Sequence, residues 1–590
     1  MRIRFLPCFA LAFIASQVVT GALDAAETPP VVYVDQGAKW TALTRADYYV
    51  QNQGSQMIPL AWLLALKQPS GASFTEDHLA RYGYLPNPDG TAGLPVGFPA
   101  SGPQGNEVVG MTCSACHTRE ITVSGQPYRI DGGPAIVDFQ SFLKDLDVAV
   151  GDVANNPTAF AAFAQAVLGP RTSDPVAFAE LNEDLAIWYQ RYHTLIVGAL
   201  PTPAWGPSRL DAVGMIFDRL TGLDLGPAPA YLLPDNIKKA DAPVRYPFLW
   251  NAPIQDMTQW PGFADNGNDL LGLARNLGEV YGVFGTFHPV KDRLKLLGYN
   301  YIGNNSANFD GLSKAENLIK LIGPPRWPWG IDTALAARGQ DVFNRSTDAG
   351  GCVECHGITK GKFRGLFITT WGTPIQDVKT DQREVDNIQA SAVDPGALDG
   401  ASIYGLTPPL AKGSSAFNVL SVSVLGAIIQ HTFSFSAPQR LEAVEGAANA
   451  PATALPPGLE DLQGAFRKPG TTTTSTGLPS AAKAEAPVAA YEARVLEGIW
   501  AAAPYLHNGS VPTLADLLKR VAERPKSFKI GPAYDLSSVG LAVEQTKFDY
   551  TLESTDCSEI KSGNSRCGHE YGTNLPAEDK KALLEYLKSL

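Results

Sequence analysis

Two short cysteine–histidine motifs constrain this chain more than any other feature of its sequence. They read Cys-Ser-Ala-Cys-His at 113–117 and Cys-Val-Glu-Cys-His at 352–356. Two cysteines about one helical turn apart, followed directly by histidine, are typical of c-type haem attachment: both thiols bond the porphyrin and the imidazole ligates the iron. The motifs therefore predict two covalent haems, bound through Cys113, Cys116, Cys352 and Cys355, with His117 and His356 as proximal ligands.

Zinc or a redox-active dithiol are the alternatives to haem at these motifs. Two Cys-x-x-Cys pairs could supply four thiolates to one zinc ion. Zinc gives no reason for a histidine directly after both pairs, and the pairs lie in different halves of the chain. The later cysteines Cys557 and Cys567 close a short loop, where a disulfide is the expected structure in an oxidising compartment.

Residues 1–26 are expected to be a cleaved export signal. Arg2 and Arg4 precede an apolar run over 5–19, and small residues such as Ala25 and Ala26 follow it. The run is shorter than the roughly 20 residues of a spanning helix, which favours cleavage over retention as an anchor. Because haem c is attached outside the cytoplasm, we expect a periplasmic or secreted protein without a membrane span in its mature form.

Composition bounds the partners and the size of the fold. A net charge of -12 argues against nucleic acid as a partner, because the phosphates would be repelled. A chain of 590 residues with 45% hydrophobic residues can build several packed units. Helical spacing is clearest over 47–67, 136–200, 331–344 and 576–590, so we predict a mainly α fold with long loops and little β structure.

The two motifs suggest two haem domains after the signal. We predict an N-terminal cytochrome c-like domain over 27–330 and a C-terminal one over 331–590, with a Pro/Trp-rich connector at 323–330. The stretch 445–488 is rich in Ala, Thr and Pro and is predicted to be a flexible insertion.

The sixth iron ligand distinguishes a haem that reacts from one that only conducts electrons. No methionine follows Met257, so the second haem cannot take one from its own domain. His569, in a Gly-His-Glu-Tyr-Gly loop just before the last helix, is the favoured ligand, His507 is the second candidate and His431 the third. A bis-His iron has a lower potential than a Met/His iron.

The first haem has no nearby candidate for a sixth ligand. The next histidine after His117 is His193, and the other distant options are His78, His288, Met215 and Met257. The simplest hypothesis is an open coordination position that accepts H2O2 or O2. The segment 260–284 supplies candidate catalytic residues for its distal side: Trp260, Arg275, Glu279 and Phe284. Arg275 and Glu279 are four apart on a predicted helix, so a surface ion pair is the alternative for these two.

Several scattered motifs resemble a known superfamily. The order of the first motif, Trp-Asn-Ala-Pro at 250–253, Gln259-Trp260, the second motif and the 504–514 segment is similar to the bacterial di-haem cytochrome c peroxidase and MauG superfamily. The chain length, together with the segments at 275–280 and 568–572, more closely resembles the rubber oxygenase A (RoxA) branch.

The resemblance implies two cytochrome c domains, a low-spin electron-relay haem in the C-terminal one and a reactive haem at His117. It also implies a distal carboxylate role for Glu279. Calcium between the haems occurs in the peroxidase branch, and we keep Ca2+ as a candidate although no ligand motif compels it. Two departures favour the oxygenase-like branch: this chain lacks the relay methionine of the peroxidases, and it lacks a match to their displaceable histidine.

Three functions are consistent with the sequence. The leading one is a di-haem oxidoreductase of peroxidase or dioxygenase type, using a small electron-donor protein or a hydrophobic organic substrate. Electrons would pass between the haems through tryptophans, for which the candidates are Trp250, Trp260, Trp327 and Trp329. In the dioxygenase version Trp260, Phe263 and Phe284 would shape an apolar substrate pocket. The alternatives are a non-catalytic electron-transfer cytochrome and a scaffold with structural haems.

Overall fold

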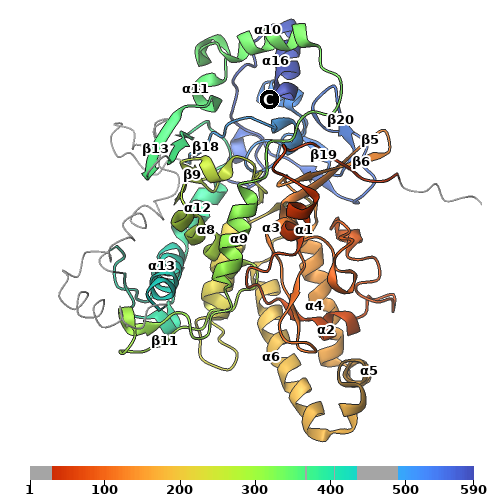
Figure 1. Ribbon diagram of the computed structural model, residues 1–590, viewed down its shortest axis with the longest axis vertical. Helices are drawn as coiled ribbons and strands as arrows, with labels where there is room; N and C mark the ends of the chain where they lie inside the picture. Colours follow the sequence, from red (N-terminus) through yellow and green to blue (C-terminus); the bar gives the residue numbers. More distant parts are fainter. Residues whose placement is uncertain (1–28, 366–367, 404–405, 435–488) are drawn as a thin grey trace, which may run out of the picture.

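The computed structural model describes residues 29–365, 368–403, 406–434 and 489–590 (Figure 1). The insertion predicted at 445–488 lies outside these residues. The structure is mixed: 41% is helical and 14% is strand. The expectation of a mainly α fold with little β structure is therefore only partly right. The strands were missed because most are two residues long, which is too short for an alternating pattern to identify.

A helical lobe forms the lower end of the molecule in Figure 1. It contains α4 (Phe139–Asn155), α5 (Pro157–Leu168) and α6 (Pro175–Ala199), with the short α2 (Leu60–Ala65) packed on α5. Each long helix starts at a side chain that accepts a backbone N–H, as expected for N-caps: Asp138, Asn156 and Asp174. Their apolar faces form one core with Phe142 and Leu185.

The segment expected to be helical over 47–67 is broken in the middle. The chain forms α1 (Ala42–Val50), then strand β2 (Ile58–Pro59), then α2. Strand β2 joins β4 (Val108–Val109) and β3 (Ala100–Ser101) in a small antiparallel sheet directly before the first cysteine motif. The tertiary pairing with this sheet outweighs the helical pattern of the sequence.

A second sheet follows the first motif. Strands β5 (Thr118–Val123) and β6 (Gln126–Asp131) form a hairpin, and β1 (Val32–Tyr33) pairs with β6 in parallel. The hairpin starts at the residue after His117, so it fixes the direction in which the chain leaves the motif. The Tyr48 hydroxyl donates a hydrogen bond to the His117 carbonyl at 3.0 Å.

The central part of the molecule is a second helical core. Its helices are α7 (Ala212–Phe217), α8 (Asp269–Gly282), α9 (Phe309–Ile319), α12 (Arg383–Ala390) and α13 (Ala416–Ser434), and a π-helical turn, η4 (Asp218–Gly222), continues α7. Within the described residues α13 is the one helix long and apolar enough to cross a membrane, and 72% of its apolar window is buried inside the protein. Core helices of soluble proteins have the same composition.

The C-terminal lobe lies at the upper end of Figure 1. It contains α10 (Thr333–Phe343), α11 (Val353–His356), α15 (Leu514–Leu517) and α16 (Ala577–Ser589). The helices predicted at 331–344 and 576–590 are thus confirmed within one to two residues. They pack so closely that the space beside Gly339 is filled by the Ala582 carbonyl.

Ten small sheets, none with more than three strands, occur in the described residues. The remaining strands are β7 (Arg209–Leu210), β8 (Val244–Arg245), β9 (Met257–Thr258), β10 (Ala264–Asp265), β11 (Val290–Lys291), β12 (Tyr299–Asn300), β13 (Lys360–Gly365), β14 (Ile368–Trp371), β15 (Ile375–Gln376), β16 (Ala392–Val393), β17 (Ser414–Ser415), β18 (Tyr491–Glu492), β19 (Ser527–Lys529), β20 (Tyr534–Asp535), β21 (Gly540–Leu541) and β22 (Thr551–Glu553).

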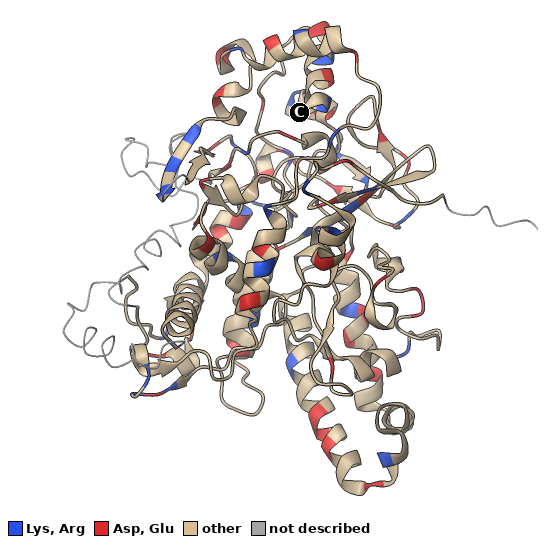
Figure 2. Cartoon of the chain, in the orientation of Figure 1, with Lys and Arg blue, Asp and Glu red and all other residues tan. Residues whose placement is uncertain are grey.

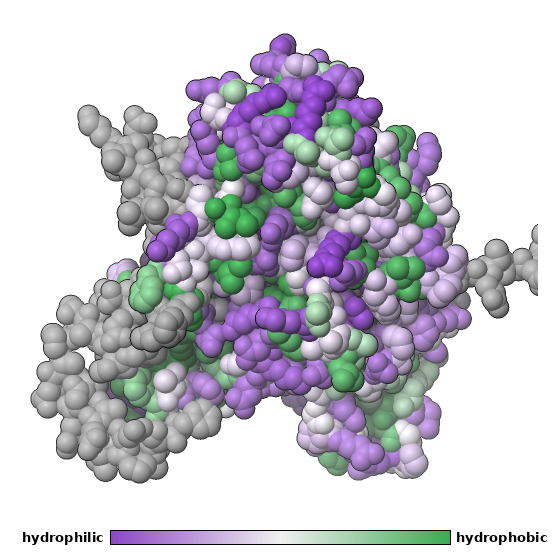
Figure 3. Space-filling view, turned by 45° about the horizontal axis from the view of Figure 1, so that its top comes forward, coloured by the Kyte–Doolittle hydropathy of each residue, from purple (hydrophilic) through white to green (hydrophobic). Residues whose placement is uncertain are grey.

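The surface carries mixed charge and scattered apolar groups. Acidic and basic side chains alternate over most elements, although β13 carries several lysines and arginines together (Figure 2). On the face drawn in Figure 3, apolar side chains form separate groups between hydrophilic ones. The buried core also joins the halves of the chain, because Trp250 and Ile121 pack in the same cluster as Trp500 and Leu583. The boundary at 330 remains a prediction.

Candidate functional site

The first cysteine motif lies on the single-turn helix α3 (Cys113–Cys116), directly before the β5–β6 hairpin. Its backbone packs so closely on Gly97 (φ +82°) that a Cβ there would lie 2.2 Å from the Ala115 nitrogen. Burial raises the pKa of both thiols, Cys113 and Cys116, to about 12. Neither thiol forms a disulfide, and the raised pKa keeps both thiols protonated.

These features disfavour the alternatives to haem. A reactive dithiol needs a thiolate, which the raised pKa of Cys113 and Cys116 disfavours. Cys352 and Cys355 line one cavity and Cys113 lines another, so the two pairs do not converge on one four-thiolate zinc site. Across the part of the chain that the structure describes, no group of three or more His, Cys, Asp or Glu residues is placed to hold a metal ion, so no such cluster supports the candidate calcium.

A cavity with about 530 Å³ of space free of protein atoms, part of it open to solvent, lies in front of His117. Cys113, Gln259, Arg275 and Glu279 line it. Burial lowers the pKa of His117 to about 4, which keeps the imidazole neutral and able to ligate a metal. Among the described lining residues there is no second histidine and no methionine. This arrangement is compatible with an open sixth position.

Glu279 is held by a neighbour that comes from a strained turn. The Gln259 side chain donates a hydrogen bond from Nε2 to Glu279 Oε1 at 2.8 Å. Gln259 has φ +67°, a left-handed conformation that is uncommon outside glycine and concentrates at functional sites. Desolvation by the surrounding protein raises the pKa of Glu279. The raised pKa favours the protonated carboxyl more than an exposed glutamate would, which suits a group that gives and takes a proton.

Arg275 does not form the surface ion pair that its spacing from Glu279 allowed. Its side chain is 9% exposed and donates to Glu316 Oε2 at 2.6 Å. Asn276 donates to the same oxygen at 3.1 Å. Glu316, on α9, thus orients two lining residues of the His117 cavity. Sequence reasoning missed Glu316 because it lies on a different helix, with no motif around it.

The other two candidate catalytic residues do not line this cavity. Trp260 lines the cavity of the second motif, and its indole donates to the Arg245 carbonyl at 2.9 Å. Phe284 packs in the core of the helical lobe and stacks with Tyr192. Phe263 lies in the central core against Phe417. Phe284 has a positive φ (+69°) two residues after α8 ends, so it does not continue the helix face that carries Glu279.

The distant candidates for a sixth ligand of the first haem also lie elsewhere. Met215 and Met257 belong to buried core clusters. The histidines all contact other groups: His78 faces the Gly93 carbonyl, His193 faces Asp147 and His288 lies 3.3 Å from Asp224. None of these five residues lines the His117 cavity.

The second motif lies on α11 and opens onto a larger, mostly apolar cavity. Its space free of protein atoms is about 1290 Å³, part of it open to solvent. Cys352, Cys355 and His356 line it together with His507 and His569. The His356 Nδ1 atom lies 2.7 Å from the Arg494 carbonyl, an arrangement that leaves Nε2 free to ligate a metal.

His569 is the histidine that faces His356. The two ring centroids are 6.1 Å apart. Two imidazoles on opposite sides of one metal, each with a nitrogen about 2 Å from it, would place their ring centroids roughly 6 Å apart. His507 lies in the same cavity but stacks on Tyr491 at 3.8 Å. His431 lies elsewhere and stacks on Phe309. The geometry of His569 therefore fits the axial position better than that of the two alternatives.

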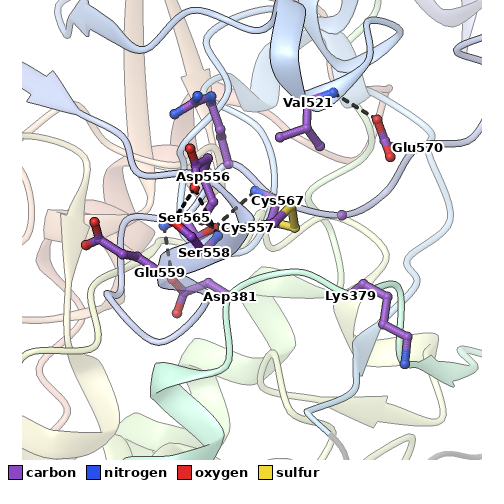
Figure 4. Close-up of a disulfide and its surroundings, with 12 residues drawn as sticks. Lys379, Asp381, Val521, Asp556, Cys557, Ser558, Glu559, Ser565, Cys567 and Glu570 are labelled. Carbon is purple, nitrogen blue, oxygen red and sulfur yellow. Dashed lines mark hydrogen bonds between the residues drawn. A yellow bond between two sulfur atoms is a disulfide. The ribbon is translucent and has the colours of Figure 1, made fainter.

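A braced loop presents His569. The predicted disulfide Cys557–Cys567 is present two residues before it (Figure 4). The Ser565 N–H also donates to Asp381 at 3.0 Å. Arg524 donates to the carbonyls of Gly568 at 2.8 Å and His569 at 3.1 Å. Burial lowers the pKa of His569 to about 3, so its imidazole is a neutral ligand.

Three residues line both cavities and were missed by sequence reasoning: Phe248, Glu492 and Arg494. The Arg494 guanidinium lies 4.2 Å above the Phe248 ring and donates to its carbonyl at 2.8 Å. Burial raises the pKa of Glu492 to about 7. The sequence does contain a signal for Glu492 and Arg494: they are two charged residues inside an otherwise apolar segment, 489–496.

Haem fits this set of residues. Cys352, Cys355 and the neutral His356 line one cavity, and Cys113 and the neutral His117 line the other, with the free thiol of Cys116 one helical turn from Cys113. Arg245 and Arg494 are nearly buried cations at the cavities; Arg494 lies 3.6 Å from Glu492, and among the described residues no carboxylate forms an ion pair with Arg245. Haem propionates would supply the missing negative charge, because buried cations need a counter-charge.

Comparison with known proteins supports this assignment for one part of the chain. Residues 490–529 match a family described as RoxA-like, cytochrome c-like. Almost the whole chain is similar to the uncharacterized protein y4iJ of Sinorhizobium fredii (strain NBRC 101917 / NGR234), with 29% identity over 618 residues, covering 96% of this chain and 94% of that protein. The uncharacterized protein y4iM of the same strain is 36% identical over 122 residues, 17% of this chain and 28% of that protein.

The matched segment carries part of both cavities. It contains Glu492, Arg494 and His507. The chain therefore has a cytochrome c-like segment, which implies haem c as a cofactor.

Proposed function

We propose that the protein is an exported di-haem c-type cytochrome that reduces H2O2 at the haem of His117. The haem bound at Cys352 and Cys355, held between His356 and His569, relays electrons to it. The cytochrome domains extend over 27–330 and 331–590, and the location is the periplasm or beyond. The electron source is a small donor protein.

The difference between the two cavities carries this proposal. His356 faces a second imidazole at a distance that suits two axial ligands. His117 faces Gln259, Arg275 and Glu279 instead, none of which is a usual axial ligand of haem. One iron would then be closed and the other open to a small oxidant.

The lining of the His117 cavity favours peroxide chemistry. When bound, a haem would supply the redox-active iron at which H2O2 is reduced. The overall reaction consumes H2O2, two protons and two electrons and yields two H2O. Glu279 moves a proton between the peroxide oxygens, a role favoured by burial, which raises the pKa of this carboxyl. Arg275, held by Glu316, stabilises the negative charge that develops.

Phe248 and Arg494 form a direct protein link between the two cavities. Both line each cavity, and the Arg494 carbonyl faces His356 Nδ1. Of the tryptophans considered as relays, Trp250 stacks on Phe248 at 4.7 Å, while Trp327 and Trp329 pack with Trp500 farther along the same core.

Dioxygenation of a hydrophobic organic substrate is the second candidate function. It is favoured by the match of residues 490–529 to the RoxA-like family. The cavity contacts disfavour it, because the expected apolar wall of Trp260, Phe263 and Phe284 does not line the His117 cavity.

Parallel assays of the purified holoprotein test the proposal. Peroxide consumption with a reduced cytochrome or dye should proceed over many turnovers. Oxygen uptake with a polyisoprene or another hydrophobic alkene should stay at background. Oxygen uptake without peroxide turnover would favour the dioxygenase, and activity in neither assay would favour a simple electron carrier.

A further inference from the structure

A third cavity lies between α6 and the π-helical turn η4, away from both cysteine motifs. It has about 600 Å³ of space free of protein atoms, part of it open to solvent. Neither haem cavity shares a lining residue with it.

One wall of this cavity is a row of aromatic rings. Trp188 stacks on Tyr192 with centroids 4.6 Å apart and planes 15° apart. Tyr192 stacks in turn on Phe284 at 5.8 Å and 24°. Such a wall suits a flat, apolar group, which gains both buried area and stacking contacts.

A buried cation lies at the end of the row. The Arg219 guanidinium lies 4.7 Å above the Phe284 ring, and the residue is 4% exposed. Its Nε atom has no hydrogen-bond partner, and Nη2 makes a single long contact of 3.5 Å to the Gly285 carbonyl. Arg219 belongs to the π-helical turn, and such turns are frequent at functional sites.

The charges around the cavity do not balance. Among the carboxylates, Asp224 has the largest electrostatic effect on Arg219. It is already paired with Arg191 at 2.9 Å and contacts His288 at 3.3 Å. Asp218, beside Arg219 in the sequence, accepts the Lys238 backbone N–H at 2.9 Å and forms no ion pair with Arg219. Two arginines therefore share one carboxylate. A buried, unpaired guanidinium is costly, so this site has room and need for an anion.

We propose that this cavity binds a small aromatic carboxylate, with the ring against Trp188, Tyr192 and Phe284 and the carboxylate on Arg219. The carboxylate supplies the missing negative charge, and its two oxygens accept the free guanidinium hydrogens. A neutral aromatic molecule would leave Arg219 unpaired, and an aromatic cation would be repelled. The proposal does not rest on the haem chemistry above.

Calorimetric titration of the full holoprotein with benzoate tests this site. Benzoate should bind, whereas benzyl alcohol and benzylamine should bind at least tenfold more weakly, and acetate more weakly than benzoate because it lacks the ring. This comparison requires no variant. Equal binding of benzoate and benzyl alcohol, or no binding of benzoate, would overturn the proposal.

Variants locate the site. Arg219→Gln should weaken benzoate binding about tenfold or more, and Arg219→Lys should restore part of the affinity. Arg171→Gln, at an exposed arginine beyond α5 that lines no cavity, should leave the affinity unchanged. Equal affinity of wild type and Arg219→Gln for benzoate would place binding elsewhere and contradict the assignment.

Discussion

The hydrogen-bond partners of Glu279 and Arg275 determine their roles more than their four-residue spacing on α8 does. The two residues share a face of α8, yet Gln259 holds Glu279 and Glu316 holds Arg275. The carboxyl is therefore left without a direct ion pair to Arg275. Its raised pKa follows from this environment.

The first prediction concerns this carboxyl. Glu279→Gln should lower the peroxide turnover rate roughly 10²–10⁴-fold, because the amide cannot transfer the proton. The haem absorption spectrum should be unchanged. Asp269→Asn is the matched control, since Asp269 lies on the same helix but its side chain is 85% exposed. A Glu279→Gln variant with wild-type turnover would remove Glu279 from the mechanism.

The second prediction concerns a buried carboxyl away from the motifs. Glu384 is 3% exposed, its Oε2 atom has no hydrogen-bond partner, and burial raises its pKa well above 4.5. The folded protein therefore holds a proton that the unfolded chain releases above pH 4.5. The contribution of Glu384 to the free energy of unfolding is therefore most favourable below pH 4.5. It decreases as the pH rises above 4.5, by at most about 1.4 kcal/mol per pH unit.

Glu384→Gln should remove this penalty. The variant should melt at a higher temperature than wild type at pH 7.5, and the difference should shrink as the pH falls to 4.5. Thermal unfolding measured across this range checks the sign. A difference that stays constant with pH would contradict the assignment of this carboxyl.

At the scale of elements, the loop at 565–572 determines where His569 lies. A disulfide and the Arg524 guanidinium both brace it. Arg524→Gln should remove charged donors to the loop carbonyls, each worth ~1.5–3 kcal/mol. Part of the low-spin haem signal should then convert to high spin. Arg520→Gln, at an exposed arginine bonded to Asn574, is the control. An unaltered spectrum in Arg524→Gln would show that the loop does not depend on this brace.

The contact between α10 and α16 gives the fourth prediction. A Cβ at Gly339 would lie 2.0 Å from the Ala582 carbonyl oxygen, so Gly339→Ala should force the helices apart. We expect a loss of about 1–3 kcal/mol in the free energy of unfolding, measured by denaturant titration. Gly330→Ala, where nothing lies within 4 Å, should be neutral. Equal stability of the two variants would contradict this packing.

Helices and local chemistry could be predicted from the sequence, but partners distant in the chain could not. The helices at 331–344 and 576–590 and the Cys557–Cys567 disulfide depend on local patterns, and the structure contains them. Glu316 contacts Arg275 across 41 positions, and the Arg494 carbonyl faces His356 across 138. Such contacts depend on how elements pack, and a single sequence does not record that packing.

At the scale of the molecule, the two halves of the chain share a hydrophobic core and both contribute residues that line the two cavities. Phe248, from before residue 330, and Glu492 and Arg494, from after it, line both cavities. Two haems bound there would be separated by a few side chains. This closeness makes a division of labour between a closed relay iron and an open reactive iron physically reasonable.

The most direct test of this account is the ligand response of the two irons in the purified, oxidised holoprotein. Electron paramagnetic resonance and absorption spectra should detect two haems per chain, one high-spin and shifted by cyanide, the other low-spin and indifferent to it. Two low-spin irons that both ignore cyanide and peroxide would contradict the account and leave an electron carrier.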